Sequence, residues 1–189
     1  MTLANQLTMV RFGLALATFG ALMHASPYAH ALAFSLFVAA MVTDWVDGYV
    51  ARTTHSVSPF GKVADPIADK VLVIGAMIGL SRLHAGVPLW TVFLIMAREL
   101  LMGGVRVLTI TQQGRILAAE RWGKISMAVQ SGSVLAMIAL LVARELVPVP
   151  LPTYKLTYLL AVVCVAMAWS SAYKYFQQSR QLLEKSWGS

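Results

Sequence analysis

Acidic residues gather in one part of the chain, at a spacing that suits metal-assisted chemistry. Four of the eight acidic residues form two pairs, Asp44 with Asp47 and Asp65 with Asp69, and both pairs border apolar segments of bilayer length. Separations of three and four residues place the members of a pair on one helix face. Because carboxylates at membrane depth need a compensating charge, four of them favour two bound divalent cations. The pattern indicates a metal site that acts on phosphate groups.

The residues around the two pairs fit the same chemistry. The first pair closes one apolar segment and the second pair opens the next, so the connection between the segments brings the four carboxylates together. Gly48 and Gly61 have no side chain, which lets a flat ligand or a neighbouring backbone approach closely. Arg52 offers a planar guanidinium to phosphate oxygens, and Pro66 is expected in the first turn of a helix. Because the clustered ligands are all carboxylates, Mg²⁺ or Mn²⁺ is favoured over Zn²⁺.

The elements that must position these residues are membrane-spanning helices. Hydrophobic residues make up 58% of the 189 residues and charged residues only 12%, against about 25% charged residues in soluble domains. Bilayer-length apolar segments predict an all-α integral membrane protein, a six-transmembrane-helix bundle formed by a single domain over residues 1–189. The segments run over Thr8–His24, Ala31–Val50, Ile67–Leu83, Pro88–Thr109, Lys124–Ala143 and Tyr154–Tyr173.

The positive charges predict the orientation of the bundle and its partners. The net charge is +7, and the basic residues stand at the ends of apolar segments, a pattern that favours membrane lipid headgroups or phosphorylated substrates and no nucleic acid. Basic residues concentrate after the second and fourth segments and at the C-terminus, which predicts that both termini and the carboxylates face the cytoplasm. These residues are Arg52, Lys62, Lys70, Arg115, Arg121, Lys174, Arg180 and Lys185.

The spacing of the acidic stretch resembles a known family signature. From Asp44 to Asp69 the chain follows the pattern D-x2-D-G-x2-A-R-x8-G-x3-D-x3-D, in which every fixed position is met. This is the signature of the CDP-alcohol phosphatidyltransferases. The resemblance implies transfer of a phosphatidyl group from a CDP-linked lipid to an alcohol, with release of CMP and with two Mg²⁺ (or Mn²⁺) ions as cofactors.

Residue roles follow from the same resemblance. It implies that the four aspartates bind the metal ions and that Asp69 is also the catalytic base for the acceptor hydroxyl. It places further residues around CDP-diacylglycerol, two of them in an opening motif Asn5-x2-Thr8-x2-Arg11 that also fits the family. The residues expected at the CDP-lipid are Gly48, Ala51, Arg52, Gly61, Asn5 and Thr8.

Matches beyond the signature resemble one branch of the family, the bacterial phosphatidylglycerophosphate synthases. They include Ala97-Arg98-Glu99 and Gly123-Lys124. This resemblance implies glycerol 3-phosphate as the acceptor, with Arg106 and Lys124 holding its phosphate and Arg98 assisting. It also implies a homodimer in the bacterial inner membrane with the active site facing the cytoplasm. Arg98 and Glu99 could instead be a buried ion pair with a structural role.

One departure from this branch concerns the acceptor. The branch pattern reads Gly-Lys-x-Lys-Thr, whereas this chain has Ser126 and Met127 at the last two positions. A cation lost from the acceptor pocket leaves open a weaker affinity for glycerol 3-phosphate or another alcohol, namely inositol phosphate, serine, or phosphatidylglycerol as in cardiolipin synthases.

Two alternatives concern the carboxylates themselves. Each pair alone could be a set of hydrated residues at a helix end, and Asp65 with Asp69 could be favourable charges at a helix N-terminus. A cation transporter could also use such carboxylates. Transporter sites, however, lie near mid-bilayer between the broken helices of repeated halves, and the sequence shows no such repeat.

Overall fold

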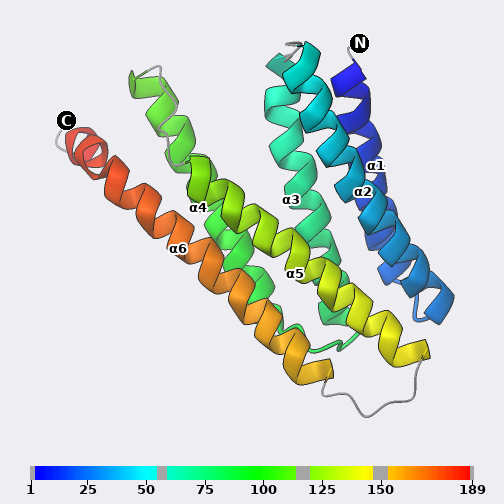
Figure 1. Ribbon diagram of the computed structural model, residues 1–189. Helices are drawn as coiled ribbons and strands as arrows, with labels where there is room; N and C mark the ends of the chain where they lie inside the picture. The colour runs from blue at the N-terminus through cyan, green and yellow to red at the C-terminus, as the bar shows by residue number, and fades with distance from the viewer. Residues whose placement is uncertain (1–2, 55–58, 114–119, 147–152, 188–189) are drawn as a thin grey trace.

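Over the residues that the structure describes, the protein is a bundle of six α-helices (Figure 1), as the apolar segments predict. The computed structural model describes residues 3–54, 59–113, 120–146 and 153–187, and within them the side chains of residues 6–46, 64–105, 122–146 and 153–177. The helices are α1 (Leu3–Leu22), α2 (Pro27–Thr54), α3 (Pro59–Arg82), α4 (Leu89–Gln113), α5 (Glu120–Leu146) and α6 (Thr153–Trp187).

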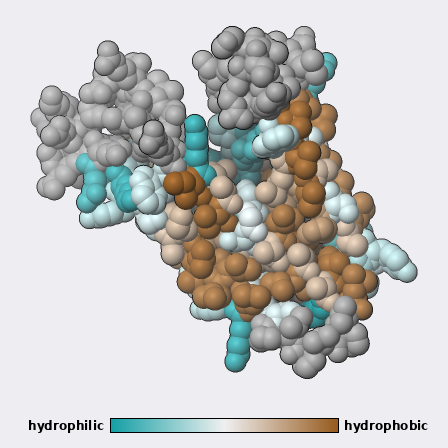
Figure 2. Space-filling model, in the orientation of Figure 1, coloured by the Kyte–Doolittle hydropathy of each residue, from teal (hydrophilic) through white to brown (hydrophobic). Residues whose placement is uncertain are grey.

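Several of these helices have the length and composition of membrane spans, so the chain is a multi-pass membrane protein. In the described residues, Pro27–Val46, Trp122–Leu146 and Thr153–Gln177 are long and apolar enough to cross a bilayer, and Gln6–Leu22 is a shorter apolar helix. In Figure 2 apolar residues cover the middle of the visible face, and polar residues lie towards its two ends. This distribution is that of a surface in contact with acyl chains.

Helix α3 begins earlier than the sequence predicts. Pro59 is its first residue, a position that suits proline because the first turn leaves its backbone N–H groups unpaired in any case. Pro66 therefore lies inside the helix, and the expectation that it occupies the first turn is wrong. An interior proline removes one backbone hydrogen bond and favours a local bend. This interruption falls between the signature residues Asp65 and Asp69.

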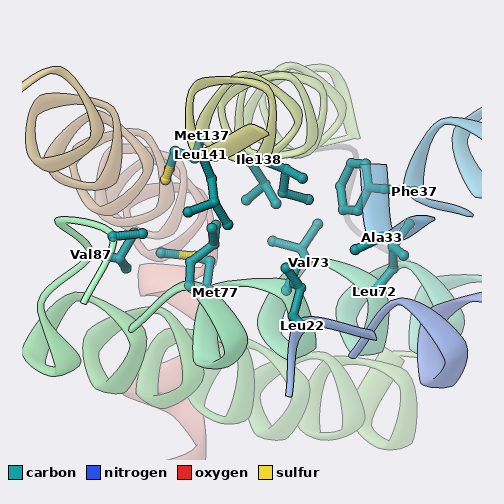
Figure 3. Packing of buried hydrophobic residues seen from close by; sticks show 14 of the residues in the cluster. Leu22, Ala33, Phe37, Leu72, Val73, Met77, Val87, Met137, Ile138 and Leu141 are labelled. Atoms are coloured by element: carbon teal, nitrogen blue, oxygen red, sulfur yellow. The ribbon is translucent and has the colours of Figure 1, made fainter. Parts of the chain in front are cut away.

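The helices form two groups that share one core. Helix α1 packs against α2 and α3, while α5 packs against α6 and α2, and α4 against α6 and α3. Phe37 of α2, Val73 of α3 and Ile138 of α5 meet in the buried centre (Figure 3). Successive helices alternate in direction, so both termini lie at the same end of the bundle, where the two groups diverge (Figure 1). The core thus fixes the groups at the other end.

Helices α1 and α3 run parallel at close distance, and one glycine permits this approach. A Cβ atom added at Gly79 would lie 2.6 Å from the Cβ of Leu22, closer than two carbon atoms can approach. Leu22 is completely buried there. The same pairing of the two helices brings Thr8 to Asp65 and Arg11 to Asp69 nearer their N-termini. Contact at Gly79 therefore helps to set the register that positions polar residues.

We expect Gly79→Ala to destabilise the protein by about 1–3 kcal/mol, because the new methyl group forces α1 away from α3. Thermal unfolding of the purified protein in detergent measures the loss. Gly132→Ala is the matched control, since a Cβ there meets nothing within 4 Å and alanine favours a helix over glycine by about 1 kcal/mol. Equal melting temperatures for the two variants would contradict the role of Gly79.

Candidate active site

Three of the four signature aspartates meet a single arginine at the end of the bundle that carries the termini. Asp44 comes from α2, and Asp65 and Asp69 come from α3. The Nη1 atom of Arg11, on α1, lies 3.0 Å from Oδ1 of Asp44 and 3.3 Å from Oδ1 of Asp69. The same nitrogen lies 4.0 Å from Oδ1 of Asp65. Helices α2 and α3 therefore bring the acidic residues together as the sequence predicts.

Arg11 is buried, whereas the carboxylates reach solvent. Its side chain is 1% exposed, against 56% for Asp44, 40% for Asp65 and 29% for Asp69. Thr8, one helical turn before Arg11, is also buried and donates a hydrogen bond to Oδ1 of Asp65. Thr8 therefore lies beside a signature aspartate, while its predicted role at the CDP-lipid stays a prediction.

Arg11 is a residue of the site that was not predicted from the sequence. Its signal was a lone cation inside an otherwise apolar segment, because a charge at that depth requires an opposite charge nearby. The spacing from Thr8 to Arg11 is three residues, so both side chains lie on one face of α1. Those two observations indicate that Arg11 needs an anionic partner, but they do not identify the aspartates of α2 and α3 as that partner.

The cluster carries an excess of negative charge that suits cations. Arg11 compensates one of the three carboxylates that it contacts, and the carboxylates offer several oxygens to solvent. Carboxylate oxygens are the ligands that Mg²⁺ and Mn²⁺ prefer. The donor set therefore fits divalent cations. Within the described ranges no three Asp, Glu, His or Cys side chains are already grouped as ligands of one metal ion, because the guanidinium lies between the carboxylates.

Several predicted site residues lie where the structure describes no side chains. Asp47, Gly48, Ala51 and Arg52 belong to the last part of α2, Gly61 to the start of α3, Asn5 to the start of α1 and Arg106 to α4. Their assignments to the metal, the CDP-lipid or the acceptor fall outside the described side chains and stay predictions.

The position at which α3 starts tests the alternative that Asp65 and Asp69 are only favourable charges at a helix N-terminus. Because the helix begins at Pro59, Asp65 and Asp69 lie in its second and third turns. The favourable field of a helix N-terminus acts within the first turn only. A helix-dipole role therefore does not account for these two aspartates, whereas their contacts with Thr8 and Arg11 do give them local partners.

A second ionic cluster joins α3, α4 and α6. Glu99 of α4 binds Lys70 of α3, with Oε2 2.9 Å from Nζ, and its Oε1 accepts a hydrogen bond from Nη1 of Arg98. Arg98 also donates from Nε to the carbonyl of Ala168 and from Nη2 to Oγ of Ser171, both at 3.1 Å. Both members of the Arg98–Glu99 pair are buried. These contacts form a structural link, and an acceptor role for Arg98 stays a prediction.

The start of α5 carries the predicted acceptor residue Lys124 and the departure from the branch pattern. Lys124 is exposed. Ser126 is buried, and its Oγ accepts a hydrogen bond from Nε2 of Gln130 at 3.0 Å. The serine thus occupies an internal position within α5 and is held by its own helix, while Met127 is half-buried.

Comparison with known proteins identifies the relatives of this chain. The sequence profile of the CDP-alcohol phosphatidyltransferases matches residues 1–172. The chain is 37% identical over 160 residues to the CDP-diacylglycerol–glycerol-3-phosphate 3-phosphatidyltransferase of Bacillus subtilis, covering 85% of this chain and 79% of the relative. It is 38% identical over 124 residues to a probable phosphatidylglycerophosphate synthase of Mycobacterium tuberculosis, covering 64% and 57%. A CMP-forming cardiolipin synthase of Oryza sativa is 34% identical over 128 residues, covering 63% and 39%.

Proposed function

The chain belongs to the CDP-alcohol phosphatidyltransferase family of phospholipid-biosynthetic enzymes, and on this premise we propose that it transfers the phosphatidyl group of CDP-diacylglycerol to glycerol 3-phosphate. The products are phosphatidylglycerophosphate and CMP. The observation that carries the proposal is the convergence of Asp44, Asp65 and Asp69 on one point at an end of the bundle. These three residues occupy signature positions of the family. The relatives of this chain in Bacillus and Mycobacterium carry names that state this activity.

The chemistry requires positive charge beside the diphosphate, and the aspartates would provide the means to hold it. Asp44, Asp47, Asp65 and Asp69 would bind two divalent cations, Mg²⁺ or Mn²⁺, through carboxylate oxygens. When bound, such ions neutralise charge on the phosphate oxygens and align the attacking and leaving groups. Arg52, Gly48, Ala51 and Gly61 would pack around the CDP group, with Asn5 and Thr8 beside them.

Asp69 would act on the acceptor. Its carboxylate takes the proton from the attacking hydroxyl of glycerol 3-phosphate as the oxygen forms a bond to the phosphorus of the phosphatidyl group. The bond between this phosphorus and the bridging oxygen breaks, and CMP leaves with that oxygen. Asp69 is 29% exposed, so the side chain is open to an incoming hydroxyl group. Arg106 and Lys124 would hold the acceptor's phosphate, with Arg98 assisting.

Location and assembly complete the proposal. The six apolar segments predict six spans, and the distribution of basic residues predicts that both termini and the site face the cytoplasm. The cytoplasmic side gives direct access to glycerol 3-phosphate and CDP-diacylglycerol. A bacterial inner membrane follows from the family resemblance. A homodimer follows from the family resemblance alone.

Another acceptor is the first rival of this proposal, and two observations favour it. One relative is a cardiolipin synthase, and Ser126 replaces a lysine of the branch pattern at a buried position. Purified protein should be incubated with CDP-diacylglycerol and, in turn, glycerol 3-phosphate, inositol phosphate, serine and phosphatidylglycerol, with and without a chelator. Rapid CMP release with glycerol 3-phosphate alone, lost on chelation, is the expected result. Release with another acceptor would replace the proposed substrate, and metal-dependent release with any acceptor would exclude a cation transporter.

We expect Arg106→Ala to raise the KM for glycerol 3-phosphate roughly 10–100-fold, the cost of a lost hydrogen bond to a charged group. The KM for CDP-diacylglycerol should change little, because Arg106 is assigned to the acceptor alone. Steady-state CMP release with each substrate varied separately measures both constants. Arg121→Ala is the matched control, since that arginine is expected to contact lipid headgroups. Equal effects on the two KM values would contradict the acceptor role.

A further inference from the structure

We propose that Arg11 is a tethered cation that occupies the carboxylate cluster and competes there with the divalent cations. The inference rests on the proposed function, because it concerns metal binding at the same aspartates. It assigns to α1 a role that the family signature, confined to α2 and α3, does not contain.

The position of one atom carries the inference. Three contacts join the same nitrogen, Nη1 of Arg11, to the Oδ1 atoms of Asp44, Asp69 and Asp65, at 3.0, 3.3 and 4.0 Å. A guanidinium that only neutralised one partner would bind a single carboxylate through two of its nitrogens. Nη1 instead lies at the point where carboxylates from two helices converge, which is the position that a shared metal ion requires.

The distances to the carboxylate oxygens distinguish a guanidinium nitrogen from a metal ion. A nitrogen that donates hydrogen bonds lies about 3 Å from its acceptors, whereas Mg²⁺ lies about 2.0–2.1 Å from its oxygen ligands. The three Oδ1 atoms are therefore spaced for the guanidinium, and they would have to move inwards to bind a metal ion at the position of Nη1. Two cations that share the same oxygens also repel each other, and solvent screens this repulsion less because Arg11 itself is buried. Metal binding consequently has to displace Nη1 from the cluster or proceed at a lower affinity.

The buried position of Arg11 gives it a second role, which is to hold three helices together. Arg11 is 1% exposed on its side chain, and α1 has no other charged residue within its described side chains. Its charge holds Asp44 of α2 and Asp69 of α3 together, and so α1, α2 and α3 stay assembled before the metal ions bind. The cost is a weaker affinity for those ions.

The test uses Arg11→Met, which removes the charge and keeps an apolar side chain. Thermal unfolding is followed in detergent with EDTA and at rising Mg²⁺, and Mn²⁺ binding is measured by calorimetry. We expect the melting temperature in EDTA to fall by about 5 °C or more, most of this loss to disappear at saturating Mg²⁺, and the half-saturating Mn²⁺ concentration to fall about tenfold. The inference would be overturned if Arg11→Met lowered the melting temperature equally with and without metal, or if this variant bound Mn²⁺ more weakly than the wild type.

Two further variants make the result specific. Arg11→Lys retains the charge, so we expect its half-saturating Mn²⁺ concentration to stay within about threefold of the wild-type value. A tenfold fall in Arg11→Lys, as large as the fall expected for Arg11→Met, would contradict competition by charge. Arg82→Met is the matched control, because Arg82 donates to the carbonyl of Met23 at the other end of α1, and its effect on melting should not depend on metal. A wild-type protein that binds neither Mg²⁺ nor Mn²⁺ would instead refute the metal site of the proposed function.

Discussion

Asp69→Asn is expected to reduce turnover by about 10³-fold or more while leaving the protein folded. Asparagine keeps the shape of the side chain but cannot take a proton, and a positioned general base contributes about 10²–10⁴-fold. The change also removes one negative charge from a cluster in which three carboxylates share Arg11. Asp44 and Asp65 still compensate Arg11, and the new amide oxygen can still accept a hydrogen bond from it, so we expect little loss of stability or of CDP-lipid binding. CMP release under saturating substrates measures the turnover.

The comparison with Asp65→Asn separates the two roles assigned to Asp69. Asp65 is expected only to bind metal, so a rise in Mg²⁺ concentration should restore much of the activity that its replacement removes. No Mg²⁺ concentration should restore Asp69→Asn, because the missing group is the base. Activity near the wild-type level in Asp69→Asn, or its recovery with Mg²⁺, would show that another group accepts the proton.

The sequence predicted the helices and the meeting of the acidic residues because both depend on short-range patterns. Apolar segments of bilayer length predict helices independently of what packs beside them. The two acidic pairs lie on consecutive helices, so a short connection was sufficient to bring them together. The start of α3 was misjudged because the apolar segment begins only at Ile67, whereas the helix begins at Pro59, a residue that fits the first position of a helix.

The partners of the charged residues could not be predicted in the same way, because they come from helices distant in the sequence. Nothing local connects Arg11 with Asp69, 58 residues away, or Lys70 with Glu99. The sequence placed Arg98 next to Glu99 but left a direct pair uncertain, because adjacent helical residues point about 100° apart. The packing of α4 between α3 and α6 is what gives both residues their partners.

Two ionic clusters, one on each face of α3, follow from this packing. Asp69 turns towards α1 and α2, and the next residue, Lys70, turns towards α4. Glu99 thus connects the helix that carries the proposed base with Arg98, which is bound to α6 through Ala168 and Ser171. The distance between the aspartates and the proposed acceptor residues on α4 and α5 depends on this link.

Glu99→Gln is therefore expected to destabilise the protein by about 3 kcal/mol, because it leaves Arg98 and Lys70 without their counter-charge. Glu99 is 9% exposed on its side chain and Arg98 is 8% exposed, so solvent replaces little of the lost interaction. The melting temperature in detergent should fall by roughly 5–10 °C. Turnover measured well below that temperature should also fall, since α3 and α4 lose a direct connection beside the site.

A second replacement tests whether the loss of counter-charge causes the destabilisation by Glu99→Gln. Lys70→Met combined with Glu99→Gln removes one of the two uncompensated cations, so the double variant should be more stable than the sum of the single changes predicts, by about 1 kcal/mol or more. Glu145→Gln is the matched control. Glu145 contacts Nδ1 of His30 at 2.6 Å through Oε1, so its replacement deprives neither an arginine nor a lysine of the counter-charge that Glu99 supplies to Arg98 and Lys70. Glu145→Gln could destabilise the protein as much as Glu99→Gln, and the double variant could be strictly additive. Those two results together would show that the charges of Lys70 and Arg98 are not what Glu99 compensates.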